Sequence, residues 1–297
     1  MLSLSPLRRR GGAAGVGLVR CVSATVDGVF CVASLVPSPP VLVPELEGAA
    51  GAAADGVLAT LRAAVLRAAG ELSARASRWI VVGVADAEQS SGAEADRVIG
   101  SDSVGTFRGY GVDVRVGLAG SVAERVAADR RPDPLLPLPA LIAGWLREKV
   151  APAAVAECRL ISADASADEA LTFGRRLRAE LDAEPEPSAV LVVGDGAATL
   201  SLKAPRYFDE RAEAVQSTID RALSAGDRQA LAALDTRQCA EVEVEGRPAY
   251  QALAGLFAAD PLDPRVETLY ADAPFGVAYH VSVWRPGAQP RDPGAPR

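Results

Sequence analysis

Three short runs of apolar residues constrain the fold of this chain more than any other feature, at 30–36, 79–84 and 189–194. They are too uniformly apolar to leave one face in water, so the strands that they predict need cover on both faces. The segments between them carry apolar residues at helical spacing, as in 49–78 and 167–181. Strands that alternate with helices predict an α/β layered fold, with a mostly parallel or mixed central sheet flanked by helices.

The rest of the chain is expected to complete one domain at 29–285, because no internal repeat and no strong linker divides it. Further strands are expected at 112–116, 158–162 and 276–284, and further helices at 121–130, 138–149, 209–225, 227–234 and 246–258. The polar stretch 85–111, rich in glycine and serine, predicts a long loop. Residues 1–28 are interpreted as a disordered extension or the product of an upstream start codon, and residues 286–297 as a disordered tail.

Composition narrows the classes of partner and compartment. The net charge is −7, and the longest run of like charge is the three arginines at 8–10, which argues against a nucleic-acid surface. No run reaches the length of a membrane span. The cysteines show no spacing typical of metal ligands, and two of them lie in apolar runs, so we expect buried thiols and a reducing, cytoplasmic compartment. The cysteines are Cys21, Cys31, Cys158 and Cys239.

The first apolar run ends in a proline-rich segment, 37–46, with prolines at 37, 39, 40 and 44. Proline fixes its own φ and pushes the preceding residue to extended geometry, so this loop has a defined shape. A buried strand followed by a shaped loop at its carboxyl end is how open α/β sheets build the wall of a ligand crevice. The plainer interpretation is a rigid exit from a core strand.

The strand and loop at 30–46 resemble the N-terminal segment of the class III extradiol ring-cleavage dioxygenases of the LigB type, and of their Memo-like relatives. Three later segments resemble further motifs of that family in the same order: 79–86, 193–198 and 245–255, followed by a similar closing strand at 273–279. The resemblance spans about 30–284. It implies the family's α/β fold, an Fe(II) cofactor, catechol ring cleavage, and association with a second subunit or a second copy.

At the places that the resemblance assigns to the family's histidines, this chain has Ser38, Asp86 and Ala198, while Asp195 is kept. In the family, a helix carries the glutamate that binds the iron. The corresponding position in this chain is Gly246 or, one residue away, Glu245. Non-haem Fe(II) of this type needs two histidines and one carboxylate, and the chain contains a single histidine, His280. The iron site therefore cannot be built within one chain, and we expect neither a metal nor a cofactor.

The prediction is a family member that has lost ring cleavage and keeps a crevice for a small molecule or a partner. Its lining is expected from Ser38, Pro39, Asp86, Gly194, Asp195, Gly196, Glu245 and Tyr250. An active enzyme that uses Asp86, Asp195 and Glu245, with or without a divalent ion, remains an alternative, as does a structural or assembly module. Asp195 followed by glycine also fits an ordinary turn, and His280 fits a strand histidine satisfied by hydrogen bonding.

Overall fold

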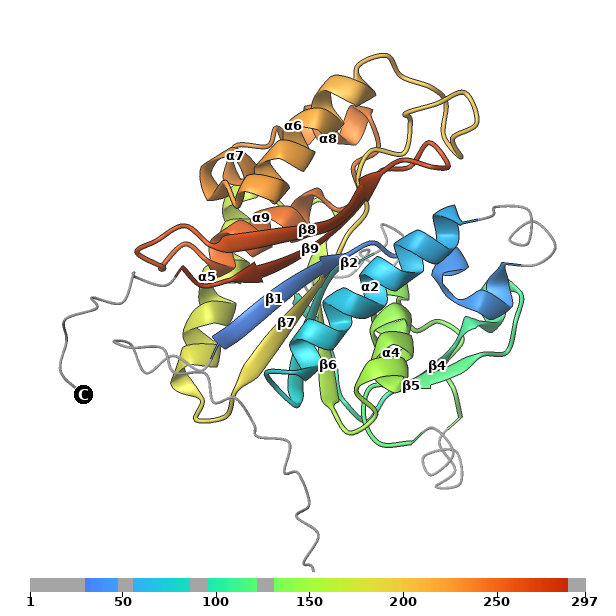
Figure 1. Cartoon of the computed structure of the whole chain (residues 1–297), viewed down its shortest axis with the longest axis vertical. Helices are drawn as coiled ribbons and strands as arrows, with labels where there is room; N and C mark the ends of the chain where they lie inside the picture. The colour runs from blue at the N-terminus through green and yellow to red at the C-terminus, as the bar shows by residue number, and fades with distance from the viewer. Residues whose placement is uncertain (1–29, 48–55, 86–95, 122–130, 288–297) are drawn as a thin grey trace, which may run out of the picture.

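Residues 30–47, 56–85, 96–121 and 131–287 are described by the computed structural model of this chain. Within them, seven strands form one mixed sheet in the order β3-β6-β2-β7-β1-β9-β8, and helices cover both of its faces (Figure 1). The expected fold class is therefore confirmed. The expectations for 1–28, for the helix at 121–130 from residue 122 on, and for most of the tail lie outside the described residues.

The four central strands, β6-β2-β7-β1, are parallel, and antiparallel strands extend the sheet on both sides. β3 pairs with β6, β9 pairs with β1, and β8 pairs with β9. Two further strands, β4 and β5, form a separate antiparallel ribbon. The strands are β1 Phe30–Val36, β2 Arg78–Ala85, β3 Asp96–Ile99, β4 Val104–Thr106, β5 Arg115–Gly117, β6 Val155–Ser162, β7 Ser188–Val193, β8 Arg265–Asp272 and β9 Tyr279–Arg285.

The helices divide between the two faces. On one face lie α2 (Val57–Ser73) and α4 (Leu138–Val150), and on the other lie α5 (Ala167–Ala183), α6 (Ala212–Ala225) and α9 (Arg247–Leu256), with the short α7 (Arg228–Ala232) and α8 (Thr236–Glu241). Alternate side chains of each central strand enter opposite cores, because successive residues of a strand point to opposite faces. Leu191, for example, packs with α2 and α4, and Val192 with α5 and α9.

Local signals in the sequence explain where several elements begin. Ser166 and Glu169 form a reciprocal capping box at the start of α5, and Asp227 caps α7 by accepting two backbone N–H groups, as expected for that residue. The proline-rich segment after β1 forms two short 3₁₀ turns, η1 (Pro40–Leu42) and η2 (Pro44–Leu46), each with proline as its first residue.

Some sequence expectations were wrong. The stretch 85–111 is not one long loop, because Ile99, Val104 and Phe107 are buried and their segments form β3, β4 and the 3₁₀ turn η3 (Phe107–Tyr110). The strand expected at 112–116 is β5, shifted toward the C-terminus and paired in the ribbon. β8 and α8 were not predicted. Among the helices that the structure describes, none has the length and apolar character that crossing a bilayer requires.

Candidate functional site

The candidate site lies where β1 and β7, neighbours in the sheet, reach their carboxyl ends. The chain after β1 leads to α2 on one face, and the chain after β7 leads to α6 on the other face. The last bond between the two segments runs from the backbone N–H of Gly194 to the carbonyl oxygen of Val36, at 3.1 Å. Loops that leave neighbouring parallel strands toward opposite faces open the crevice in which α/β proteins bind ligands.

Ser38 and Asp195 meet directly at this point. The Ser38 backbone N–H donates to Asp195 Oδ1 at 2.9 Å, and the Ser38 hydroxyl donates to Asp195 Oδ2 at 2.6 Å. Both residues keep part of their surface exposed. Burial disfavours the charged carboxylate and raises the pKa of Asp195 to about 6, against the two Ser38 donors, which lower it, and with a smaller rise from the nearby charge of Glu245.

The N-terminus of α9 packs against the backbone of Gly194 and Asp195. Gly246 donates its N–H to the carbonyl oxygen of Asp195 at 2.9 Å, and a Cβ on Gly246 would lie 2.5 Å from that oxygen. Glycine is therefore required by the close approach of two backbones. The fully buried Tyr250 donates its hydroxyl to the carbonyl oxygen of Gly194 at 3.2 Å, and burial raises its pKa well above the ordinary value. Tyr250 thus holds the backbone directly before Asp195 in place.

The turn after Asp195 is held on its other side by α6 and by the residue directly before β9. Gly196 donates its N–H to the carbonyl oxygen of Ala278 at 2.9 Å, and Ala197 donates to Gln216 Oε1 at 2.9 Å. Gly196 is not among the glycines with positive φ, so backbone conformation does not explain why the residue after Asp195 is a glycine. A Cβ there would lie 2.4 Å from Gln216 Oε1, so space explains the glycine.

The structure brings together most of the residues expected at the crevice. The structure places Ser38 against Asp195, with a glycine on either side of Asp195, and Pro39, which follows Ser38, is buried. Glu245, directly before Gly246, is exposed, and its carboxylate lies 3.8 Å from the Arg206 guanidinium. Asp86 lies outside the described residues, so its expected place in the crevice stays a prediction.

His280 lies on β9, with its side chain against α6. Its side chain is 1% exposed, and its Nδ1 lies 3.1 Å from Asp220 Oδ1. Its Nε2 is buried with no hydrogen-bond partner among the described residues. Within the same residues, no group of three or more His, Cys, Asp or Glu side chains is arranged to hold a metal ion. The donors present at the crevice do not match a two-His, one-carboxylate iron site.

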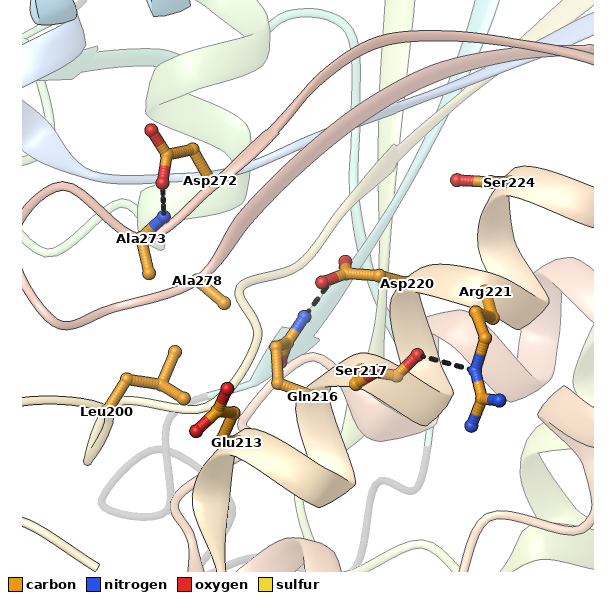
Figure 2. A pocket seen from close by; sticks show the side chains of 10 residues that line it. All are labelled: Leu200, Glu213, Gln216, Ser217, Asp220, Arg221, Ser224, Asp272, Ala273 and Ala278. Carbon is orange, nitrogen blue, oxygen red and sulfur yellow. Dashed lines mark hydrogen bonds between the residues drawn. The ribbon is translucent and has the colours of Figure 1, made fainter. Parts of the chain in front are cut away.

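Sequence reasoning missed a cleft of about 420 Å³ between α6 and the turn that joins β8 to β9 (Figure 2). Gln216 connects it to the Asp195 turn, because its Oε1 accepts from Ala197 and its Nε2 donates to Asp220 Oδ1 at 3.0 Å. The available signal was the four-residue spacing of Gln216, Asp220 and Ser224 on the helix expected at 209–225. The lining residues are Leu200, Glu213, Gln216, Ser217, Asp220, Arg221, Ser224, Asp272, Ala273 and Ala278.

Comparisons with known proteins add one structural likeness. No protein-family model matches the chain, and no curated protein matches it. Among solved structures, it is similar to the crystal structure of an uncharacterized protein from Escherichia coli K12, with a TM-score of 0.49 and 12% sequence identity. The match covers 86% of this chain and 99% of that chain.

Proposed function

We propose that this chain is a small-molecule-binding protein of the class III extradiol dioxygenase type, similar to the LigB proteins, that has lost Fe(II)-dependent ring cleavage. The ligand would occupy the crevice at the carboxyl ends of β1 and β7, over Ser38, Asp195 and the flanking glycines, with Glu245 at the rim. The observation that carries the proposal is the carboxylate of Asp195, which is desolvated, fixed by Ser38 and still partly exposed.

The contacts of Asp195 differ from those of aspartates that only shape the backbone. Asp227 and Asp235 accept backbone N–H groups two or three residues ahead of them, as N-caps do. Asp195 instead accepts both of its side-chain bonds from Ser38, 157 residues earlier in the chain. A carboxylate that is positioned by a segment distant in the sequence, at the carboxyl ends of the strands, is typical of a ligand-orienting group. This supports a binding role over the plain turn.

The loss of ring cleavage rests on the donor set. The chain has one histidine, and its Nδ1 lies 3.1 Å from Asp220 Oδ1. A single chain thus lacks the two imidazoles that hold catalytic Fe(II) and the further base that takes the catechol proton. We further propose a reducing, cytoplasmic location, supported by Cys31, Cys158 and Cys239, which are all buried free thiols.

The test is binding of a panel of catechols and other hydroxylated aromatic compounds by calorimetry, beside iron content and O₂ uptake of anaerobically purified, Fe(II)-supplemented protein. We expect binding without oxygen consumption, weakened by at least about tenfold in Asp195→Asn. Asp263→Asn, which alters an exposed carboxylate remote from Ser38, is the matched control and should bind normally. Stoichiometric iron with oxygen uptake would overturn the loss of activity, and an unaffected Asp195→Asn variant would overturn the assignment of the crevice.

A second candidate function is acid–base catalysis by Asp195, and the pKa of about 6 favours it. A carboxyl group that titrates close to neutral pH is suited to exchange protons with a substrate. Once a turnover assay exists, this candidate predicts a rate that rises with pH through about 6 if Asp195 acts as the base. It also predicts loss of turnover in Asp195→Asn with binding retained. Unchanged turnover in that variant would eliminate the candidate.

A further inference from the structure

The loop between β7 and α6, residues 201–208, exposes an unusual amount of apolar surface. Leu202 is 90% exposed, Tyr207 97% and Phe208 51%, and the positively charged Lys203 and Arg206 lie between them. Figure 1 shows the chain between β7 and α6 projecting beyond the helices beside the β8–β9 turn. Large apolar side chains gathered in one protruding segment indicate an interaction site more often than a surface that binds no partner.

The base of this loop is fixed, so its tip is presented in a defined place. Leu200 donates its N–H to the carbonyl oxygen of Gly276 at 3.1 Å, and Asp209 donates to the carbonyl oxygen of Thr199 at 3.0 Å. The two bonds close the loop where it leaves the body of the protein. Gly276, with φ of +73°, packs so tightly that a Cβ would lie 2.4 Å from Ser201 Oγ.

The cleft beside the loop base has the complementary charge. Glu213, Asp220 and Asp272 contribute three carboxylates and Arg221 one positive charge (Figure 2). The Arg221 side chain is engaged along its own helix, with Ser217 and Thr218. Among the described residues no cluster could hold a single metal ion, so the carboxylates do not converge on one point. Carboxylates that are spread apart in this way suit a partner surface that carries several separate positive charges. Apolar lining from Leu200, Ala273 and Ala278 completes the cleft.

We propose that the occupant of this cleft is loop 201–208 of a second copy of the same chain, in a twofold-symmetric dimer. Leu200 lies in the cleft wall and directly precedes the loop, so the cleft opens at the loop's base. When two such loops lie side by side in opposite directions, each tip reaches the other copy's base. This arrangement is self-complementary, as a twofold interface requires. It is independent of what the Ser38–Asp195 crevice binds.

The expected contacts follow from the two surfaces. Lys203 and Arg206 would face the carboxylates of the other copy, and Tyr207 would bury its ring against the apolar lining. Arg206 would lose little free energy by turning to the other copy, because its ion pair with Glu245 is 3.8 Å long and largely exposed. Tyrosine and arginine are the residues that most often dominate interface energy, and each would act twice in the dimer. Attraction between exposed charges also predicts weaker dimerisation at high salt.

The first experiment is sedimentation equilibrium of the full-length chain. We expect a dimer whose dissociation constant rises at least about thirtyfold in Tyr207→Ala, since a central interface tyrosine carries about 2 kcal/mol or more. Leu135→Ser, which alters another large exposed apolar residue, is the matched control and should leave the dimer intact. Circular dichroism verifies that each variant is folded. A monomeric wild-type protein, or a dimer indifferent to Tyr207→Ala, would overturn the proposal.

A charge-exchange experiment then tests which surfaces meet. K203E/R206E makes the loop negative, and E213K/D272K makes the cleft positive, so each variant alone should be monomeric through repulsion. Mixed together they should form a heterodimer, because both loop–cleft contacts then join opposite charges. Absence of the heterodimer would overturn the pairing. Monomeric protein that instead binds anionic lipid vesicles through Tyr207 would assign the loop to a membrane surface and would equally overturn it.

Discussion

Ser38 donates to both carboxylate oxygens of Asp195, and this geometry links the two residues' chemistry. A hydrogen bond to the charged form favours ionisation, so removing the hydroxyl in Ser38→Ala should raise the pKa of Asp195 above its value of about 6. We expect a rise of roughly one unit, measured by carbon-13 NMR titration of the labelled carboxyl group. Ser201→Ala, on the neighbouring loop, should leave the titration unchanged. An unaltered titration in Ser38→Ala would show that the hydroxyl does not interact with the charged form.

The same pKa gives stability a defined dependence on pH. Because the folded-state pKa of Asp195, about 6, lies above the ordinary 3.8, the folded protein binds a proton more readily than the unfolded chain. The contribution of this group is fully present below the unfolded-state pKa and is lost as pH rises through about 6. Asparagine does not titrate, so Asp195→Asn should gain stability relative to the wild-type protein as pH rises toward neutrality. Urea denaturation of both proteins from about pH 4.5 to about 7.5 measures the difference, and a constant difference would contradict the raised pKa.

Arg147 is a structural residue that the sequence did not reveal. It is fully buried in α4, and its guanidinium donates to the carbonyl oxygens of Gly117, Gly120, Pro152 and Ala154. Arg147→Met would leave these buried acceptors without their donors and should lower the free energy of unfolding by about 3 kcal/mol or more. Arg237→Met, at an exposed pair, should change it little. Chemical denaturation compares the two variants, and equal losses would refute the role of Arg147.

At this scale, the structure shows that two of the expected site residues, Ser38 and Asp195, are in contact, and it gives the spatial reason for several glycines. Asp195 was predicted from the resemblance of 193–198 to a motif of the dioxygenase family, at the carboxyl end of the run at 189–194. Its bond to Ser38 was not predictable from spacing, since it depends on β1 and β7 pairing across the intervening chain. Gly196 and Gly246 owe their identity to close approach by other elements, which no local pattern encodes.

Among the elements, α5 and α9 approach closely, and glycine permits it. A Cβ at Gly174 of α5 would lie 2.0 Å from the carbonyl oxygen of Ala252, and one at Gly255 of α9 would lie 2.3 Å from that of Leu171. Gly174→Ala should push the helices apart and cost about 1–3 kcal/mol of stability. Gly70→Ala, in α2 with open space around it, should instead stabilise by about 0.5–1 kcal/mol, because alanine is the better helix former. Thermal and urea denaturation measure both changes, a loss of stability in Gly174→Ala and a gain in Gly70→Ala.

The elements that escaped prediction are those with weak local signals. β8 has exposed or half-buried residues throughout and mixes charged with apolar side chains, so neither strict alternation nor a continuous apolar run marks it. It is a strand because β9 offers it a partner edge. α8 has only six residues, too few for periodicity to appear. The long apolar strands and the capped helices were predicted because their signals are local and strong.

Across the whole molecule, stability should fall from the centre of the sheet to its edges. β7 is buried along its full length and pairs with β1 and β2, whereas β3 pairs only with β6 among the described strands and exposes Val98. Hydrogen–deuterium exchange followed by mass spectrometry should therefore find the slowest amides in β7 and the fastest strand amides in β3. Equal protection of the two strands would mean that the sheet opens only as one unit.

The placement of β1 between β7 and β9 has a consequence for synthesis on the ribosome. β1 emerges before the other strands of the sheet, yet both of its partners are made much later, and one of them is the last strand that the structure describes. A strand that is apolar on both faces therefore remains without its partner strands while most of the domain is translated. Such a segment is a natural target for nascent-chain chaperones and for premature association. Slow completion, rather than weak final contacts, would then limit the yield of folded protein.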